Sequence, residues 1–245
     1  MGRSNAATRS TFKSYSRSIF GRGLRERLLM FLATNRPVHV QELATAVGAD
    51  ARKVRLNLEI LERQGVVVRA MPTDGVGRFV ALRRDNPLYR PLLSLLMRME
   101  IAYPQSSVEP KPSRATERIR LGDYEKSKRR GTTLIDDADL FQSRIRTRVL
   151  LAIAACGETD AADLTSILIE DDRSVWNVVN HWEREGVVRS EARGRRRVLS
   201  LNDEWCAALE LRRLLEAMIR IRPQYRGLAE LSLRRIGGVR EGALR

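Results

Sequence analysis

The stretch VQELATAVGADARKVRLNLEILERQGVV at residues 40–67 returns at residues 161–188 as AADLTSILIEDDRSVWNVVNHWEREGVV. Both stretches belong to a longer repeat of residues 20–67 on residues 141–188, at a constant offset of 121 positions and without a gap. Apolar positions share one phase along the repeat, and both copies end their last helical pattern at a glycine. A repeat of this kind indicates two copies of one small domain.

The turn inside the first copy carries the most information. Ala44 is small enough for two helices to cross closely, Gly48 tolerates a left-handed turn, and Val54 anchors the following helix in the core. This spacing predicts a helix-turn-helix. Its helices are expected over residues 23–34, over residues 40–47, and from the capping residue Asp50 to Gln64. The second copy repeats them over residues 141–156, 160–169 and 171–185.

A β-hairpin and one more helix follow the first helix-turn-helix. Valines at 66–68, a turn rich in glycine, and an apolar run at 79–82 after Arg78 predict the hairpin, which we interpret as a wing. The helix expected from Leu88 to about Ala102 is more apolar than one such core requires, so its excess face predicts an interface, within the chain or between two chains. The candidate interface residues on this helix are Leu92, Leu96 and Met99.

The expected fold class is mainly α with small β-hairpin wings (α+β), built from two tandem winged helix-turn-helix domains. The expected boundaries are a disordered basic arm at 1–19, domain 1 with its following helix at 20–103, a linker at 104–137, domain 2 with its following helix at 138–222, and a basic tail at 223–245. A linker of this length, about 30 residues, would let each domain address a separate site.

Composition excludes several classes of protein. No apolar run approaches the ~20 residues that cross a bilayer, and no apolar signal core follows the N-terminus, so we expect a cytoplasmic, nucleoid-associated protein. Cys156 and Cys206 are the only cysteines, too few for a disulfide framework or a zinc cluster, and with just His39 and His181 beside them we expect no four-ligand metal site within the chain. Neither histidine lies near a nucleophile, and there is no phosphate-binding loop, so we expect no enzyme and no cofactor.

The charge is strongly positive but unevenly distributed. The formal net charge of +15 and the pI near 10.9 favour a polyanionic partner. Residues 20–100 hold 14 basic and 8 acidic side chains, whereas residues 138–222 hold 14 of each and are neutral. Arginine outnumbers lysine by 40 to 5, which fits a GC-rich genome and also fits guanidinium recognition of phosphate and guanine.

The third helix of the first copy presents a cationic face. Its apolar residues Val54, Leu58 and Leu61 take the inner side, so the polar ones face outward. The outward residues are Arg52, Lys53, Arg55 and Asn57. Arginine and lysine donate to guanine edges and asparagine pairs with adenine, so this set predicts DNA contact, with a solvated basic face as the alternative. Arg78, at the edge of the wing, is a further candidate for a minor groove or a phosphate, although Asp74 lies close by.

Residues 40–65, the wing and the sequence Asn86-Pro-Leu-Tyr resemble the winged helix-turn-helix transcriptional regulators of the ArsR and MarR type. The resemblance covers residues 20–102. It implies a dimeric repressor whose third helix enters the major groove, which carries over to Arg52, Lys53, Arg55 and Asn57. It does not imply a metal-sensing site, because this copy contains no cysteine.

The second copy departs from the first at the turn before its third helix. Ile169 replaces Gly48, and because a β-branched residue does not adopt the left-handed region cheaply, we expect a different turn. Carboxylates that would repel phosphates gather at the start of the third helix: Asp160, Asp163, Glu170, Asp171 and Asp172. On the helix itself, Arg173 and Asn177 are candidate DNA contacts.

Two further features distinguish the second copy. Trp176 takes the position of Arg55, where it is either exposed as a protein contact or buried by a slight rotation of the helix. The wing has a cationic tip suited to a minor groove or a phosphate track, formed by Arg193, Arg195, Arg196 and Arg197. We therefore expect any DNA contact of this copy to come from its wing, with its third helix either binding more weakly or turned toward a protein.

The sequence favours a sequence-specific double-stranded DNA-binding protein, most simply a transcriptional regulator that reads bases with the first copy. The alternative is an architectural protein of a DNA-associated complex, such as replication initiation or segregation, assembled through tandem winged helices. A homodimer or a protein partner would then use the helices after the wings, at 88–102 and 204–221.

Overall fold

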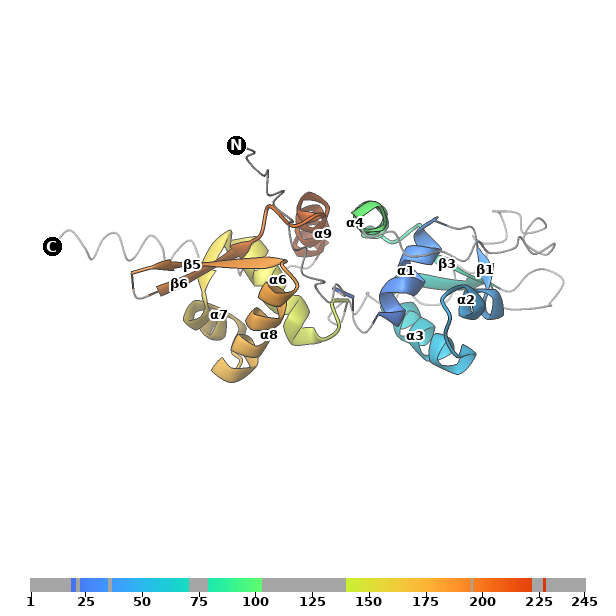
Figure 1. The fold of residues 1–245 in the computed structure, drawn as a ribbon, viewed down its shortest axis with the longest axis horizontal. Helices are drawn as coiled ribbons and strands as arrows, with labels where there is room; N and C mark the ends of the chain where they lie inside the picture. The colour runs from blue at the N-terminus through green and yellow to red at the C-terminus, as the bar shows by residue number, and fades with distance from the viewer. Residues whose placement is uncertain are drawn as a thin grey trace, which may run out of the picture.

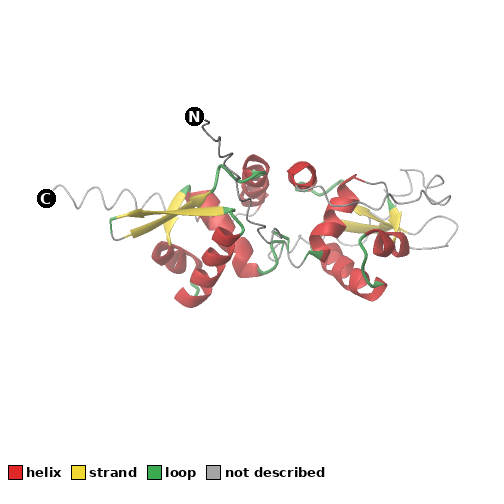
Figure 2. Cartoon of the chain, viewed as in Figure 1, coloured by secondary structure: helices red, strands yellow, loops and turns green. Residues whose placement is uncertain are grey.

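The computed structural model describes residues 19–20, 23–34, 37–70, 79–102, 140–194, 196–221 and 227. Within these ranges the chain is a mixed α and β protein with eight helices and two three-stranded antiparallel sheets, as Figure 2 shows by colour. The α+β class expected from the sequence is therefore confirmed at this level. No helix in the described ranges is long and apolar enough to span a membrane.

The first unit runs from α1 to α4 and keeps the expected order. Its elements are α1 (Leu24–Thr34), β1 (Val38–His39), α2 (Val40–Ala46), α3 (Ala51–Arg63), β2 (Val67–Ala70), β3 (Phe79–Leu82) and α4 (Tyr89–Ala102). Strand β3 lies between β1 and β2 and pairs antiparallel with both. The predicted hairpin is thus confirmed in β2 and β3.

Local sequence explains how α3 begins. The Asp50 carboxylate accepts hydrogen bonds from the backbone N–H groups of Arg52 and Lys53, at 2.9 and 3.2 Å, which confirms the predicted cap. Gly48 has a φ of +60°, as the predicted left-handed turn requires. The inner side of α3 is buried through Val54, Leu58 and Leu61, so its polar side faces solvent.

The second unit repeats the first element by element. It consists of α6 (Arg144–Cys156), β4 (Glu158–Asp160), α7 (Ala161–Leu168), α8 (Asp172–Arg184), β5 (Val188–Arg193), β6 (Arg196–Leu201) and α9 (Ala208–Ile221). Strand β6 lies between β4 and β5, as β3 does between its neighbours. The sequence repeat is therefore also a repeat of structure.

The two units share one hydrogen bond, which joins an asparagine before the last helix to the glycine that follows the third helix. In the first unit the Asn86 side-chain amide donates to the Gly65 carbonyl at 2.8 Å, and in the second Asn202 donates to Gly186 at the same distance. Each glycine ends the turn after the third helix of its unit with a positive φ, 67° and 72°. The asparagine before the last helix is thus an equivalent structural residue in both copies.

The turn before α8 corrects a prediction. Ile169 adopts φ 54° and ψ 49°, in the same left-handed region as Gly48, so the expectation of a different turn is wrong. Arg148 holds this turn from both sides, because its guanidinium donates to the Leu168 carbonyl at 2.7 Å and to the Glu170 carboxylate at 2.5 Å. Tertiary contacts thus replace the conformational freedom of glycine.

The two units pack against each other. Helix α4 lies beside α9, and α1 and α6 pack on these helices from either side (Figure 1). Phe20 and Phe141, both fully buried, stack with ring centroids 5.6 Å apart and an interplanar angle of 23°. Arg98 on α4 donates through Nε to the Cys206 carbonyl just before α9, at 3.0 Å. The sequence predicted an interface within the chain or between two chains, together with a linker that would let each domain address a separate site. In this structure the two units share an interface within the chain.

The structure also locates the candidate interface residues. Leu92, Leu96 and Met99 are all buried on the inner face of α4, so the predicted interface lies within the chain. Ile19 is buried with only 1% exposed, which places the end of the expected arm in the hydrophobic core. Arg78, Arg195, the linker at 104–137 and the rest of the arm lie outside the described residues, as does the tail apart from Gly227.

Candidate nucleic-acid interface

The N-terminal half of α3 carries a cluster of cations on its outer side. Arg52, Lys53 and Arg55 are exposed, and none of their side chains forms an ion pair with another residue in the described ranges. The positive end of the helix dipole lies in the same turn. With respect to the described part of the chain, this end of α3 therefore has unpaired charge to offer an anionic partner.

The side-chain amide of Asn57 is less available for base contacts than the sequence predicted. It is half-buried, and its Nδ2 donates to the Lys53 carbonyl of its own helix at 2.9 Å. Leu56 beside it is 53% exposed, although sequence reasoning had not singled it out. Apolar side chains at such positions contact thymine methyl groups, so Leu56 is an additional candidate on this face. The sequence did carry a signal for this residue, because Leu56 is an apolar residue outside the helical spacing of the inner face.

The C-terminal half of α3 is acidic but paired. Arg69 on β2 lies 3.0 Å from the Glu62 carboxylate and 4.0 Å from Glu59. These contacts counter the negative charge at the far end of the helix. The cationic N-terminal turns of α3 are therefore not offset by unpaired acidic residues on the following turns.

Helix α8 presents a smaller polar face in the second unit. Arg173 and Asn177 are exposed, as predicted for candidate contacts. Trp176 is half-buried and packs against the core, and the Arg197 guanidinium lies over its ring, 5.3 Å from the centroid. Trp176 is therefore neither fully exposed nor fully buried, which is intermediate between the two predicted placements. One side of its ring is covered by a cation.

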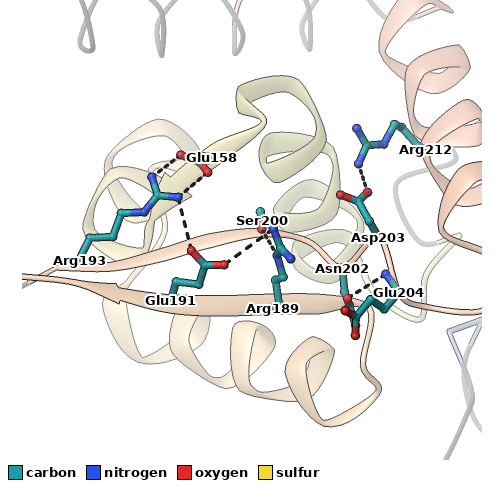
Figure 3. Close-up of polar contacts among 9 residues, drawn as sticks. All are labelled: Glu158, Arg189, Glu191, Arg193, Ser200, Asn202, Asp203, Glu204 and Arg212. Carbon is teal, nitrogen blue, oxygen red and sulfur yellow. Dashed lines mark hydrogen bonds and ion pairs between the residues drawn. The ribbon is translucent and has the colours of Figure 1, made fainter.

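The arginines of the β5–β6 hairpin are mostly paired with carboxylates. Arg193 donates to both oxygens of Glu158, at 2.7 and 2.8 Å, and lies 3.4 Å from Glu191 (Figure 3). These hydrogen bonds lower the pKa of Glu158 and raise that of Arg193. Binding a phosphate through Arg193 would require these contacts to be exchanged.

The same holds for the next strand of the hairpin. Arg197 donates to both oxygens of Glu183 on α8, at 2.7 and 2.6 Å, and to the Ser190 hydroxyl at 2.9 Å. Arg196 is different, because its side chain is 70% exposed and its nearest carboxylate, Asp160, is 3.9 Å away. The predicted cationic tip thus has Arg196 as its most available charge in the described part of the hairpin.

The acidic cluster before α8 has structural roles. Asp160 and Asp171 cap α7 and α8 by accepting backbone hydrogen bonds at 2.8 and 2.9 Å, and Glu170 pairs with Arg148. Hydrogen bonds from Ser174 lower the pKa of Asp171, which keeps this carboxylate charged. Asp171 therefore caps α8 as a charged carboxylate, as Asp50 caps α3 in the first unit.

His181 does not add to the positive charge of α8. Its ring is tilted against Trp182, with centroids 4.8 Å apart, and its Nε2 is buried with no hydrogen-bond partner among the described residues. Burial, together with the nearby positive charges of Arg146 and Arg184, lowers the pKa of His181 to about 4. The ring is therefore neutral at physiological pH.

A cleft of about 310 Å³ lies in the second unit between α6, the hairpin and α9. Both arginines of its lining have partners within it: Arg212 pairs with Asp203, and Arg189 donates to the Ser200 hydroxyl (Figure 3). The described residues contain no group of histidine, cysteine and carboxylate side chains that could hold a metal ion. The exposed cations of α3 are therefore the stronger candidate site.

Comparison with known proteins identifies no relative of this chain. No family model, no curated protein and no solved structure matches this chain. The functional proposal therefore rests on the residues and their geometry.

Proposed function

We propose that the chain is a sequence-specific double-stranded DNA-binding protein, a transcriptional regulator, and that each unit is a winged helix-turn-helix. The observation that carries the proposal is the outer face of α3. Three exposed cations, Arg52, Lys53 and Arg55, follow a left-handed turn and have no ion-pair partner among the described residues. A helix in this position enters the major groove in winged helix-turn-helix proteins, with its N-terminal residues on base edges.

The proposed contacts divide into two kinds. Arg52 and Arg55 would donate to guanine O6 and N7, whereas Lys53 and the exposed Arg196 of the second hairpin would contact phosphates. Base contacts give discrimination between sequences, and phosphate contacts give affinity that falls with salt. The two kinds of residue are therefore separable by experiment.

The test begins with selection of bound duplexes from a random pool, followed by titration of selected and scrambled DNA over a range of salt concentrations. Arg52→Ala is expected to reduce discrimination by ~1–3 kcal/mol. Arg63→Ala is the matched control, because Arg63 is an exposed arginine on the last turn of the same helix. It should leave discrimination unchanged. Equal losses for both variants on every sequence would refute base reading by α3.

Two of the three features that favoured the architectural alternative, namely Trp176, the acidic second copy and the apolar last helices, are weakened by the structure. The apolar faces of the helices after the hairpins suggested an external partner, but α4 and α9 cover each other within the chain. The half-buried Trp176, lying under Arg197, is also less available to a partner than an exposed tryptophan. DNA binding is therefore the function proposed here.

A further inference from the structure

The contact between the units joins equivalent elements. Phe20 stacks on Phe141, which is its own equivalent in the repeat, and α4 packs on α9, which is the equivalent of α4. Contacts between a residue and its own equivalent are the mark of a two-fold interface, as found on the axis of a homodimer. A single chain thus contains an interface of the kind that two subunits usually form.

This interface uses the apolar faces of both last helices. The buried residues of α4 and α9 recur at identical spacing: Leu92, Leu95, Leu96 and Met99 in α4, and Leu211, Leu214, Leu215 and Met218 in α9. The large apolar residues left exposed on these helices are Met97, Ile101, Leu209 and Ile221. With its inner faces covered, the chain does not need a second copy to bury these helices.

The same interface sets the position of the two candidate reading helices. Figure 1 shows α3 and α8 on one side of the molecule, away from α4 and α9. In a two-fold pair of helix-turn-helix units, such helices enter successive major grooves on one face of the duplex. The packing of α4 on α9 therefore places both candidate reading helices on one side of a single chain, as a two-fold dimer does with those of its two subunits.

The outer faces of these two helices differ in chemistry. Arg52 has an arginine at the equivalent position, Arg173, but Lys53 is replaced by Ser174. Arg55 is replaced by Trp176, and Leu56 by the exposed Asn177. Asparagine pairs with adenine, whereas the first face favours guanine through its arginines and thymine through its leucine. The two helices therefore suit different base sequences.

We propose that one chain binds one asymmetric duplex site made of two unlike half-sites, with α3 on the first and α8 on the second. This inference rests on the proposed function, and it changes the role of the second unit, for which the sequence had favoured the hairpin over the helix. Arg173 and Asn177 are the residues assigned to the second half-site. The half-sites lie one helical turn apart, about 10 bp, or a multiple of this.

The experiment uses the full chain and the duplex enriched from a random pool. Arg52→Ala is expected to relax base preference at one end of the site, and Arg173→Ala at the other end, each weakening binding by about tenfold. Both side chains are exposed, and circular dichroism checks that each variant folds. Inserting 5 bp between the ends should weaken binding by about 100-fold, because the half-sites then lie on opposite faces of the duplex. An equal insertion outside the site is the control. Sedimentation should give one chain per duplex.

Two results would overturn the inference while leaving DNA binding intact. One is an enriched palindrome that holds two chains. The other is a single short motif whose binding is insensitive both to Arg173→Ala and to the insertion. Absence of any enriched sequence, with binding that depends only on salt, would instead refute the proposed function itself. Asn177→Ala provides a second variant at the same end, and it must relax the same bases as Arg173→Ala.

Discussion

Replacing Ile169 by glycine is expected to stabilise the second unit. Residue 169 has φ 54° and ψ 49°, and its side chain is 91% exposed, so its removal loses little burial. An L-residue in this region costs about 1–2 kcal/mol. The greater freedom of glycine in the unfolded chain offsets about 0.4–1 kcal/mol of that gain. The free energy of unfolding should therefore rise by about 0.5–1 kcal/mol.

Urea unfolding followed by tryptophan fluorescence measures this change, because all three tryptophans lie in the second unit. Gly48→Ala is the matched variant in the first unit, followed by circular dichroism. Its added Cβ has no atom within 4 Å, so only the backbone is affected, and stability should fall by about 0.5–1 kcal/mol. A lower midpoint for Ile169→Gly would show that the isoleucine side chain stabilises the fold, and would refute the reasoning from backbone strain.

Three further predictions follow from packing and charge. Arg148→Met should lower the free energy of unfolding by ~1–2 kcal/mol in urea, because charge-assisted hydrogen bonds to the turn are lost, and by less when residue 169 is glycine. A double-mutant cycle of Phe20→Leu and Phe141→Leu should give a coupling energy of about 1 kcal/mol from the stacked rings, whereas zero coupling would mean that the units do not pack in solution. The pKa of His181 is about 4 in the folded chain and 6.5 ordinarily. Between pH 4 and 6.5 the unfolded chain therefore binds a proton at this residue that the folded chain does not bind. Stability should therefore fall as the pH drops from 6.5 to 4, and His181→Gln should flatten that slope, which chemical denaturation at each pH would measure.

The elements that the sequence predicted well have local causes. Asp50 caps α3 through hydrogen bonds to residues two and three positions later, and Gly48 supplies its turn by its own backbone. The inner face of α3 follows from helical spacing alone. Causes of this kind lie within one stretch of sequence, so a pattern of a few residues is enough to reveal them.

The features that differed depend on contacts distant in sequence. The left-handed turn at Ile169 is held by Arg148, which donates to a carbonyl 20 residues away. The hairpin looked cationic as a run of arginines, but Arg193 pairs with Glu158, 35 residues earlier, and Arg197 pairs with Glu183 on α8. Net charge along a stretch cannot show which of its charges are already paired in the fold.

The arrangement of the two units could not be predicted from the repeat itself, since a repeat fits tethered copies and packed copies equally well. The informative signal was the apolar excess of the helix at 88–102, which required some partner. A homodimer places identical reading helices on both half-sites, whereas two copies in one chain carry separate sequences. Residues that meet at the interface must remain complementary, as Phe20 and Phe141 do. Residues on the outer faces have no such constraint, and Arg55 and Trp176 differ. A shared interface with unlike outer faces is therefore the arrangement expected of a chain that binds an asymmetric site.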